Sequence, residues 1–184
     1  MGGVPKGLLR RAGSTTPIIV ELANLARDLG LPVVLVGWAE AYASVLPDAP
    51  VLEDDPPGTG PLGGLAALLA CAGPRAAIAV ACDMPHVSSR SIEMLLSTSP
   101  GASIVAPRDP TGGRWEPFLA KYDSPRVLPV LRQAQEAGIR SLQRVFESID
   151  VRPLPAEAWS AGETTDWDSP SDVAADGGHF PELP

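Results

Sequence analysis

The chain has 184 residues, with 14 Lys and Arg against 22 Asp and Glu, which gives a formal net charge of −8. Hydrophobic residues make up 45% and charged residues 20%, so the composition suits one globular domain and excludes wholesale disorder. The sequence lacks an uncharged apolar stretch of the roughly 18 residues that span a membrane. The acidic balance argues against a protein that holds nucleic acid through its phosphates. We therefore expect no membrane partner and no nucleic acid partner.

The two cysteines, Cys71 and Cys82, are too few for a disulfide framework and show no metal-ligand spacing. A reduced, cytoplasmic location follows as the expectation. Residues 1–176 are expected to form the single domain, and residues 177–184 a flexible tail.

Helix and strand signals alternate along the chain. Helical spacing with capping residues, prolines or glycines predicts helices at 18–29, 39–46, 61–72, 88–96, 124–138 and 141–148, with another starting at Ser169. Short apolar runs predict strands at 31–37, 51–52, 76–81, 103–106, 117–122 and 149–151. The alternation predicts an α/β fold with a mostly parallel sheet, whose ligands bind at the carboxyl ends of the strands.

The N-terminal segment carries a first candidate site. Gly2 and Gly3 allow the backbone to approach an anion, and Lys6 adds a positive charge. The alternative is a flexible N-terminus with one lysine.

A second candidate lies where the glycine-rich loop 53–60 enters a helix and presents free N–H groups. Gly63 and Gly64 cost that helix about 1 kcal/mol each. Either a ligand or another backbone segment must approach closely to offset this cost, and the sequence favours neither.

Carboxylates mark two further segments. Asp83 follows a buried strand, where it must be solvated, paired or bound to a metal, unless it merely caps a turn. His86 beside it is either a phosphate contact or a surface residue. Asp166 and Asp168 share one side of an extended segment and suit Mg²⁺, although acids also favour helix N-termini, which accounts for Asp172.

In this order, the four segments resemble the nucleotidyltransferases related to molybdenum cofactor guanylyltransferase. Residues 1–9, MGGVPKGLL, resemble the second half of the signature LAGGxSxRMGxxKxLL. Residues 60–65 resemble its GPLAG helix start, residues 82–85 its metal-binding CDxP turn, and residues 168–172 its terminal NTPED. The resemblance spans nearly the whole chain and implies a Rossmann-like three-layer α/β/α sandwich.

The resemblance also implies a reaction in which an oxyanion of molybdopterin phosphate attacks the α-phosphate of GTP and pyrophosphate leaves. Lys6 and Asp83 become the catalytic residues: Lys6 neutralises the triphosphate, and Asp83 with Asp168 holds Mg²⁺. The implied nucleotide contacts are Gly2, Gly3, Lys6, Asp54, Gly60, Pro61, Leu62, Gly63 and Asp83.

The acceptor, molybdopterin phosphate, is expected to bind at the loop 107–117. Arg108 and Arg114 suit an anionic pterin phosphate, and Glu116 lies beside them. A solvated hairpin tip is the alternative. The resemblance further implies transient contact with molybdoenzyme maturation proteins.

The sequence begins at the Met of the RMG portion, so the family's central first strand and the AGG part of its loop are expected to precede it. The alternatives are a defective product or another segment that fills this position. Two observations keep CTP open as an alternative to GTP: Gly37 and Trp38 stand where a guanylyl-specific relative shows Asn, and Pro5 resembles the cytidylyl branch. Another phosphorylated acceptor also stays open. A non-catalytic nucleotide-binding or interaction remnant is the hypothesis from another class.

Overall fold

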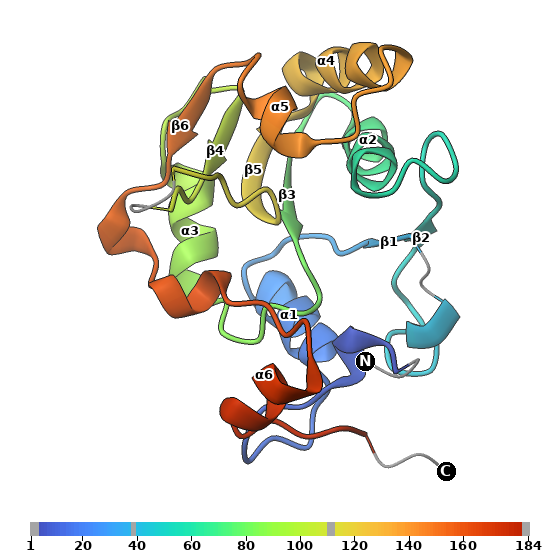
Figure 1. Ribbon diagram of the computed structural model, residues 1–184, viewed down its shortest axis with the longest axis vertical. Coiled ribbons are helices and arrows are strands. Elements are labelled where there is room, and N and C mark those ends of the chain that lie inside the picture. The colour runs from blue at the N-terminus through green and yellow to red at the C-terminus, as the bar shows by residue number, and fades with distance from the viewer. Residues whose placement is uncertain (1–3, 38–39, 110–112, 182–184) are drawn as a thin grey trace.

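The computed structural model describes residues 4–37, 40–109 and 113–181 (Figure 1). Its helices and strands are, in chain order, α1 (Ile18–Asp28), β1 (Leu35–Val36), β2 (Val51–Leu52), α2 (Pro61–Ala72), β3 (Ala76–Val80), α3 (Ser89–Ser97), β4 (Ile104–Ala106), β5 (Leu119–Asp123), α4 (Ser124–Glu136), α5 (Leu142–Phe146), β6 (Val151–Pro153) and α6 (Pro170–Ala175). Four short 3₁₀ helices join them: η1 (Lys6–Leu8), η2 (Glu40–Tyr42), η3 (Ala156–Ala158) and η4 (Ala161–Thr164).

The strands form two sheets. One has the order β3-β5-β4-β6, and the other pairs β1 with β2 in parallel. β5 runs antiparallel to both β3 and β4, whereas β4 and β6 are parallel. β3, β4 and β6 therefore run in one direction and only β5 of this sheet is reversed, so the sheet is mixed but mostly parallel, as predicted. β5 is reversed because it follows β4 through a loop without a crossover helix, which returns the chain in the opposite direction.

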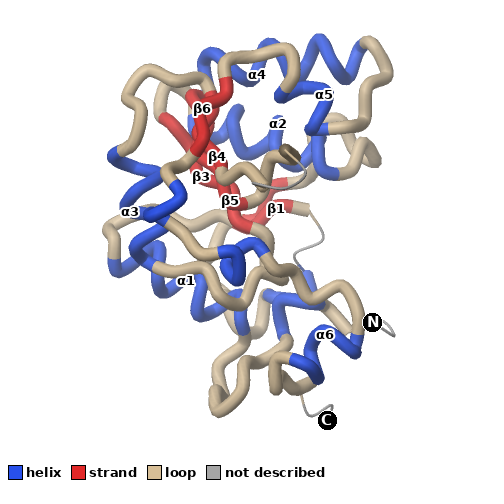
Figure 2. The backbone as a smooth tube through the Cα atoms, turned by 60° about the vertical axis from the view of Figure 1, so that its left-hand side comes forward, coloured by secondary structure: helices blue, strands red, loops and turns tan. Residues whose placement is uncertain are grey.

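Helices cover both faces of the larger sheet, which confirms the predicted three-layer α/β/α arrangement (Figures 1 and 2). Helices α2, α4 and α5 pack on one face, in a core that includes Leu62, Leu65, Leu69, Ile104, Tyr122, Val127, Leu131 and Phe146. Helices α1 and α3 cover the other, in a core that includes Met84, Ile92, Leu95, Val105, Leu119 and Leu154, with Leu22 and Leu25 against it. No helix in the described ranges is long and apolar enough to cross a membrane.

Capping serines begin three of the predicted helices. The side chains of Ser88, Ser141 and Ser169 each accept a hydrogen bond from the backbone N–H three residues later. Helix α1 begins differently, because Pro17 is its extended N-cap residue and makes no side-chain cap bond. Instead, the first helical N–H, that of Ile18, donates to the carbonyl of Leu9 at 2.9 Å.

Two predicted elements are shorter than the sequence suggested. Only Leu35–Val36 of the run 31–37 forms a strand, because its partner β2 is just as short. The predicted helix 39–46 contains the 3₁₀ turn Glu40–Tyr42, and residue 39 lies outside the described residues.

Residues 177–181, expected in a tail, are held by backbone pairing. The N–H of Arg10 donates to the carbonyl of His179 at 3.0 Å, and the N–H of His179 donates back at 2.9 Å. The division into a domain at 1–176 and a tail at 177–184 stays a prediction.

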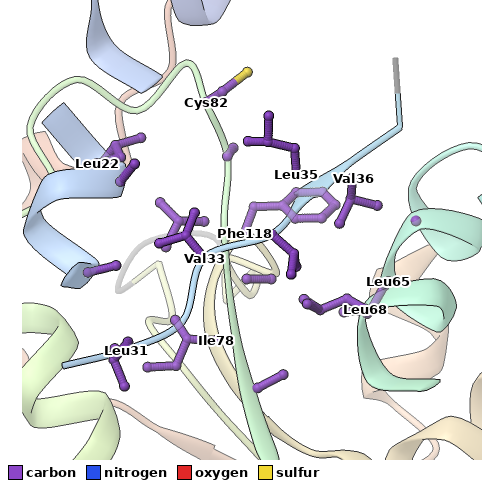
Figure 3. Close-up of a pocket in the computed structure, with 18 of the residues that line it drawn as sticks. Leu22, Leu31, Val33, Leu35, Val36, Leu65, Leu68, Ile78, Cys82 and Phe118 are labelled. Carbon is purple, nitrogen blue, oxygen red and sulfur yellow. The ribbon is translucent and has the colours of Figure 1, made fainter. Parts of the chain in front are cut away.

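A cleft of about 890 Å³ separates the two sheets (Figure 3). β1 and β3 flank it, α1 closes one side and α2 the other. Its apolar lining includes Leu22, Leu31, Val33, Leu35, Val36, Leu65, Leu68, Ile78 and Phe118. The lining also includes the carboxylates of Asp54, Asp83, Glu116 and Asp166.

Candidate active site

Three charged side chains from distant parts of the chain meet at the carboxyl end of β3. Lys6 Nζ donates to Asp83 Oδ2 at 2.8 Å and also to Asp168 Oδ1. Burial alone would lower the pKa of Lys6, but the hydrogen bonds and the negative charges of Asp168 and Asp83 raise it well above its usual value. Lys6 is therefore a permanent cation held between two carboxylates.

A glycine brings the lysine this close. Gly7 is buried, and a Cβ built on it would lie 3.0 Å from Tyr42 Cε1 and 3.2 Å from Cys82 Cβ. Its N–H also donates to the Tyr42 hydroxyl at 3.4 Å, and that hydroxyl lies 3.6 Å from Cys82 Sγ. Burial raises the pKa of both Tyr42 and Cys82, so the two groups stay neutral beside the charged cluster.

Trp167 positions the third member of the cluster. It is only 1% exposed and packs with Leu9, Ile18 and Val173. Its backbone N–H donates to the carbonyl of Asp83 at 3.0 Å, which fixes the neighbouring Asp168 beside the Asp83 turn. Burying a large aromatic side chain stabilises this corner by several kcal/mol, on the order of 3–5.

Two further carboxylates, those of Asp166 and Glu116, interact with the charges of the cluster. Burial raises the pKa of Asp166, and the charges of Asp168 and Asp83 raise it further. Burial likewise raises the pKa of Glu116, together with the charges of Asp166 and Asp83, although Glu116 also accepts a hydrogen bond from the N–H of Phe118. The predicted common side of Asp166 and Asp168 is consistent with this coupling.

Other polar residues of these segments serve the fold. Asp172 forms a capping box with Ser169 at the start of α6, and these hydrogen bonds lower the pKa of its carboxyl group. His86 Nε2 lies 2.5 Å from Asp176 Oδ2, which also accepts from Trp167 Nε1 at 3.1 Å. His86 is thus tied to the C-terminal segment.

The glycine-rich loop lies across the cleft. Asp54, Gly60, Pro61 and Gly64 contribute to its lining, as do Asp83 and Glu116 on the other side. Leu62 is 1% exposed as a whole residue, and its side chain belongs to the core.

Close packing explains the helical glycines of α2. A Cβ on Gly63 would lie 2.3 Å from Thr59 Oγ1 and 3.0 Å from the carbonyl oxygen of Pro56. A Cβ on Gly64 would lie 3.1 Å from Val36 on β1. The loop before α2 and strand β1 come so close to these glycines that a larger side chain would not fit. This packing explains why α2 contains two residues that weaken a helix, and no ligand is needed to explain them.

The loop expected to bind the acceptor is a hairpin. Arg108 lies 5.0 Å from the ring centroid of Trp115, and its Nε donates to the carbonyl of Gly113 at 3.0 Å. Arg108 and Arg114 are exposed. The positive charge of Arg114 partly offsets the rise in the pKa of Glu116. Residues 110–112 lie outside the described residues.

The sequence prediction missed Gly7 and Tyr42, which position Lys6. Their signal was weak, since the requirement for glycine at position 7 comes from neighbours in the fold. Gly2 and Gly3, predicted to contact the nucleotide, lie outside the described residues.

The donor set suits a hard divalent cation bound together with a substrate. Asp83 and Asp168 present oxygens to one cationic point, and Mg²⁺ is usually held by one or two carboxylates plus phosphate oxygens. The described residues contain no group of three or more His, Cys, Asp or Glu that could hold a metal by themselves. A substrate would have to complete the coordination shell.

A family model described as the MobA-like NTP transferase domain matches residues 1–152. The chain belongs to this nucleotidyltransferase family. It is 36% identical over 156 residues to a molybdenum cofactor guanylyltransferase from Pseudomonas putida, an alignment that covers 84% of this chain and 79% of the relative.

Solved structures show the same family fold. Molybdopterin-guanine dinucleotide biosynthesis protein A from Archaeoglobus fulgidus matches with a TM-score of 0.74 and 23% identity, over 95% of this chain and 90% of that one. A 2-C-methyl-D-erythritol 4-phosphate cytidylyltransferase from Thermus thermophilus matches with a TM-score of 0.70 and 17% identity, over 94% and 92%. The α/β nucleotidyltransferase fold predicted from the motifs is confirmed.

Proposed function

We propose that this chain transfers GMP from GTP to the phosphate of molybdopterin and releases pyrophosphate. The convergence of Lys6, Asp83 and Asp168 carries the proposal, since it puts a fixed cation and two metal-type ligands at one point. Family membership and the similarity to the Pseudomonas molybdenum cofactor guanylyltransferase support the reaction.

The chemistry follows from charge. The attacking phosphate is already ionised, so the protein needs no nucleophile, and its task is to orient the phosphates and neutralise them. Lys6 serves as the protein's own counter-charge to the triphosphate. Asp83 and Asp168 would hold Mg²⁺, which when bound supplies further positive charge to the phosphate oxygens.

The proposed nucleotide contacts are Lys6, Asp83, Asp54, Gly60, Pro61, Gly63 and the backbone of Leu62. Gly2 and Gly3 belong to the same proposal. Arg108, Arg114 and Glu116 are proposed to receive the acceptor, because the exposed arginines stand next to the carboxylate that reaches the cluster. We also propose a cytoplasmic location, in keeping with the unpaired Cys71 and Cys82, and transient contact with molybdoenzyme maturation proteins.

CTP is the second candidate donor. Pro5 and Gly37 favour it, and the similar fold of a cytidylyltransferase is compatible with it. The nucleobase of the donor nucleotide would lie on the β1–β2 side of the cleft, away from the charged cluster.

Pyrophosphate release tests the proposal. The full chain is incubated with Mg²⁺, molybdopterin and each nucleoside triphosphate in turn, and GTP should give the fastest turnover. The D83N variant should lose at least about 100-fold in rate, whereas D28N, which alters an exposed carboxylate at the end of α1, should match the parent. Turnover with CTP alone would favour the second candidate. Nucleotide binding without turnover would favour a non-catalytic protein.

A further inference from the structure

Trp115 has a special position in the hairpin that is proposed to receive the acceptor. It forms an isolated antiparallel bridge with Arg108. The hydrogen bonds on either side of this bridge, at 2.8 and 3.0 Å, join the residues next to Arg108 with the residues next to Trp115. Arg108 and Trp115 are therefore a non-hydrogen-bonded pair. The N–H and C=O groups of Trp115 consequently point away from the other strand of the hairpin.

Gln143 of α5 provides a partner for both of these backbone groups. Its Oε1 accepts from the N–H of Trp115 at 3.0 Å, and its Nε2 donates to the carbonyl of Trp115 at 2.7 Å. Both hydrogen bonds are partly buried, where a backbone group without a partner is costly. An amide offers a donor and an acceptor side by side, so Gln143 pairs with Trp115 as a neighbouring strand would.

The same helix also holds the ring of Trp115. Phe146 lies three residues after Gln143 and therefore on the same side of α5, and its ring centroid is 6.3 Å from that of Trp115. α5 is itself fixed, because Leu142, Val145 and Phe146 are buried in one core of the larger sheet. One anchored element thus holds both the backbone and the ring of Trp115.

The three residues proposed to receive the acceptor are all tied to Trp115. Arg114 and Glu116 are its neighbours in the chain, so the backbone of Trp115 sets the direction of both. The Arg108 guanidinium lies 5.0 Å from the centroid of its ring. A movement of Trp115 would shift these three charged groups together, whereas the lysine and the two aspartates of the charged cluster come from other segments.

We propose that Gln143 is a positioning residue for the acceptor. It acts through Trp115: the amide fixes the hairpin, and the hairpin presents Arg108, Arg114 and Glu116 to the acceptor as one set. This role rests on the proposed function, and within it on acceptor binding at the hairpin. Loss of the amide should therefore weaken the use of the acceptor and leave the donor nucleotide and the chemical step unaffected.

Steady-state kinetics of pyrophosphate release tests this role. Q143M keeps the length of the side chain and removes both hydrogen bonds, so the KM for molybdopterin should rise at least about fivefold. The kcat and the KM for the nucleoside triphosphate should stay within about twofold of the parent, because neither depends on the hairpin. Q143E keeps an oxygen for the Trp115 N–H and should lie between the parent and Q143M.

A matched control and a structural measurement accompany the kinetics. Gln133 is exposed on α4, and Q133M should leave all three constants unchanged. Hydrogen exchange of the full chain without substrates reports on the hairpin itself. Q143M should speed exchange at the Trp115 amide at least about tenfold and leave that of Ala81, which donates to Phe118, nearly unchanged.

R114Q separates this role from the proposed function. A raised KM for molybdopterin in R114Q but not in Q143M would overturn the role of Gln143 and leave the acceptor site in place. A KM that is unchanged in both variants would overturn the acceptor site as well. A rise in Q143M alone would support the role of Gln143 and remove Arg114 from the acceptor site.

Two further outcomes would also count against the role. If Q143M lowers kcat, or raises the KM for the nucleotide as much as that for molybdopterin, Gln143 has a general structural role and the proposal is wrong. If the parent gives no turnover with any nucleoside triphosphate, the proposed function fails and the role of Gln143 fails with it.

Discussion

The two walls of the cleft differ in how firmly they are built. The β3 wall belongs to a four-stranded sheet with a core on each face, and Asp83 just after β3 pairs with Lys6, which also pairs with Asp168. The β1–β2 wall is two short strands over a small core of Ile19, Ala23, Leu35, Leu46 and Ala49. The charges that must be fixed during phosphate chemistry thus stand on the wall with more buried contacts, and the loop proposed to meet the nucleotide stands on the other.

The largest effect is expected when the anchor of the charged cluster is removed. W167A should lower the free energy of unfolding by about 3–5 kcal/mol and release Asp168 from the Asp83 turn, with loss of turnover. Urea unfolding and pyrophosphate release measure both. W115A, which alters a half-buried ring on the Arg108 hairpin, should cost less. If W167A lowers the free energy of unfolding only slightly and keeps full activity, the charged cluster does not depend on Trp167.

A smaller effect is expected where the two walls touch. G7A places a methyl group 3.0–3.2 Å from Tyr42, Ile19 and Cys82, so it should cost about 1–3 kcal/mol and shift Lys6 away from Asp83. G162A, at an exposed glycine whose added Cβ would meet only Ser160 Oγ at an ordinary contact distance of 3.9 Å, should stay within about 0.5 kcal/mol of the parent. Equal stability of the two variants would mean that the contact between η1 and η2 is loose.

Hydrogen exchange compares the walls directly. The amides of Leu35 and Gly37 should exchange at least tenfold faster than that of Ala81, although all three hydrogen bonds measure 2.8–3.0 Å. The reason is that the small core allows the β1–β2 wall to open locally, whereas opening β3 disrupts the main core. Uniform exchange across the three amides would remove the distinction between the walls.

The smallest effect concerns Glu116. Its pKa is raised in the folded protein, so its contribution to stability is fully present below the ordinary value of 4.5 and is lost as pH rises through the higher folded value. The parent should therefore lose stability relative to E116Q between about pH 4.5 and neutrality. Melting temperatures over this range measure the difference, and E147Q, at an exposed position, should show none.

Asp83 could be predicted as a site residue because it comes after a buried strand, at the edge of the sheet where ligands bind. Lys6 and Asp168 follow no strand, and the resemblance of their motifs to the family signature is what pointed to them. Ser169 and Asp172 were readable as a helix cap from their spacing alone, and the structure shows that capping box.

Other features depend on partners that a sequence does not display. The run that forms β5 looks the same whether the strand is parallel or antiparallel, so its reversal was missed. The strand predicted at 31–37 covers only Leu35–Val36 in the structure, because the length of a strand depends on the strand it pairs with. The need for glycine at position 7 comes from Tyr42 and Cys82, which lie far away in the chain.

The lysine cluster has a practical consequence for chemical labelling. The sequence holds two lysines, and their pKa values move in opposite directions: hydrogen bonds to carboxylates raise that of Lys6, and burial lowers that of Lys121. An amine-reactive reagent at mildly alkaline pH should therefore modify Lys121 well before Lys6. A ligand that draws the carboxylates away from Lys6 would change the labelling of that residue alone, which gives the protein an internal reporter of what enters its charged corner.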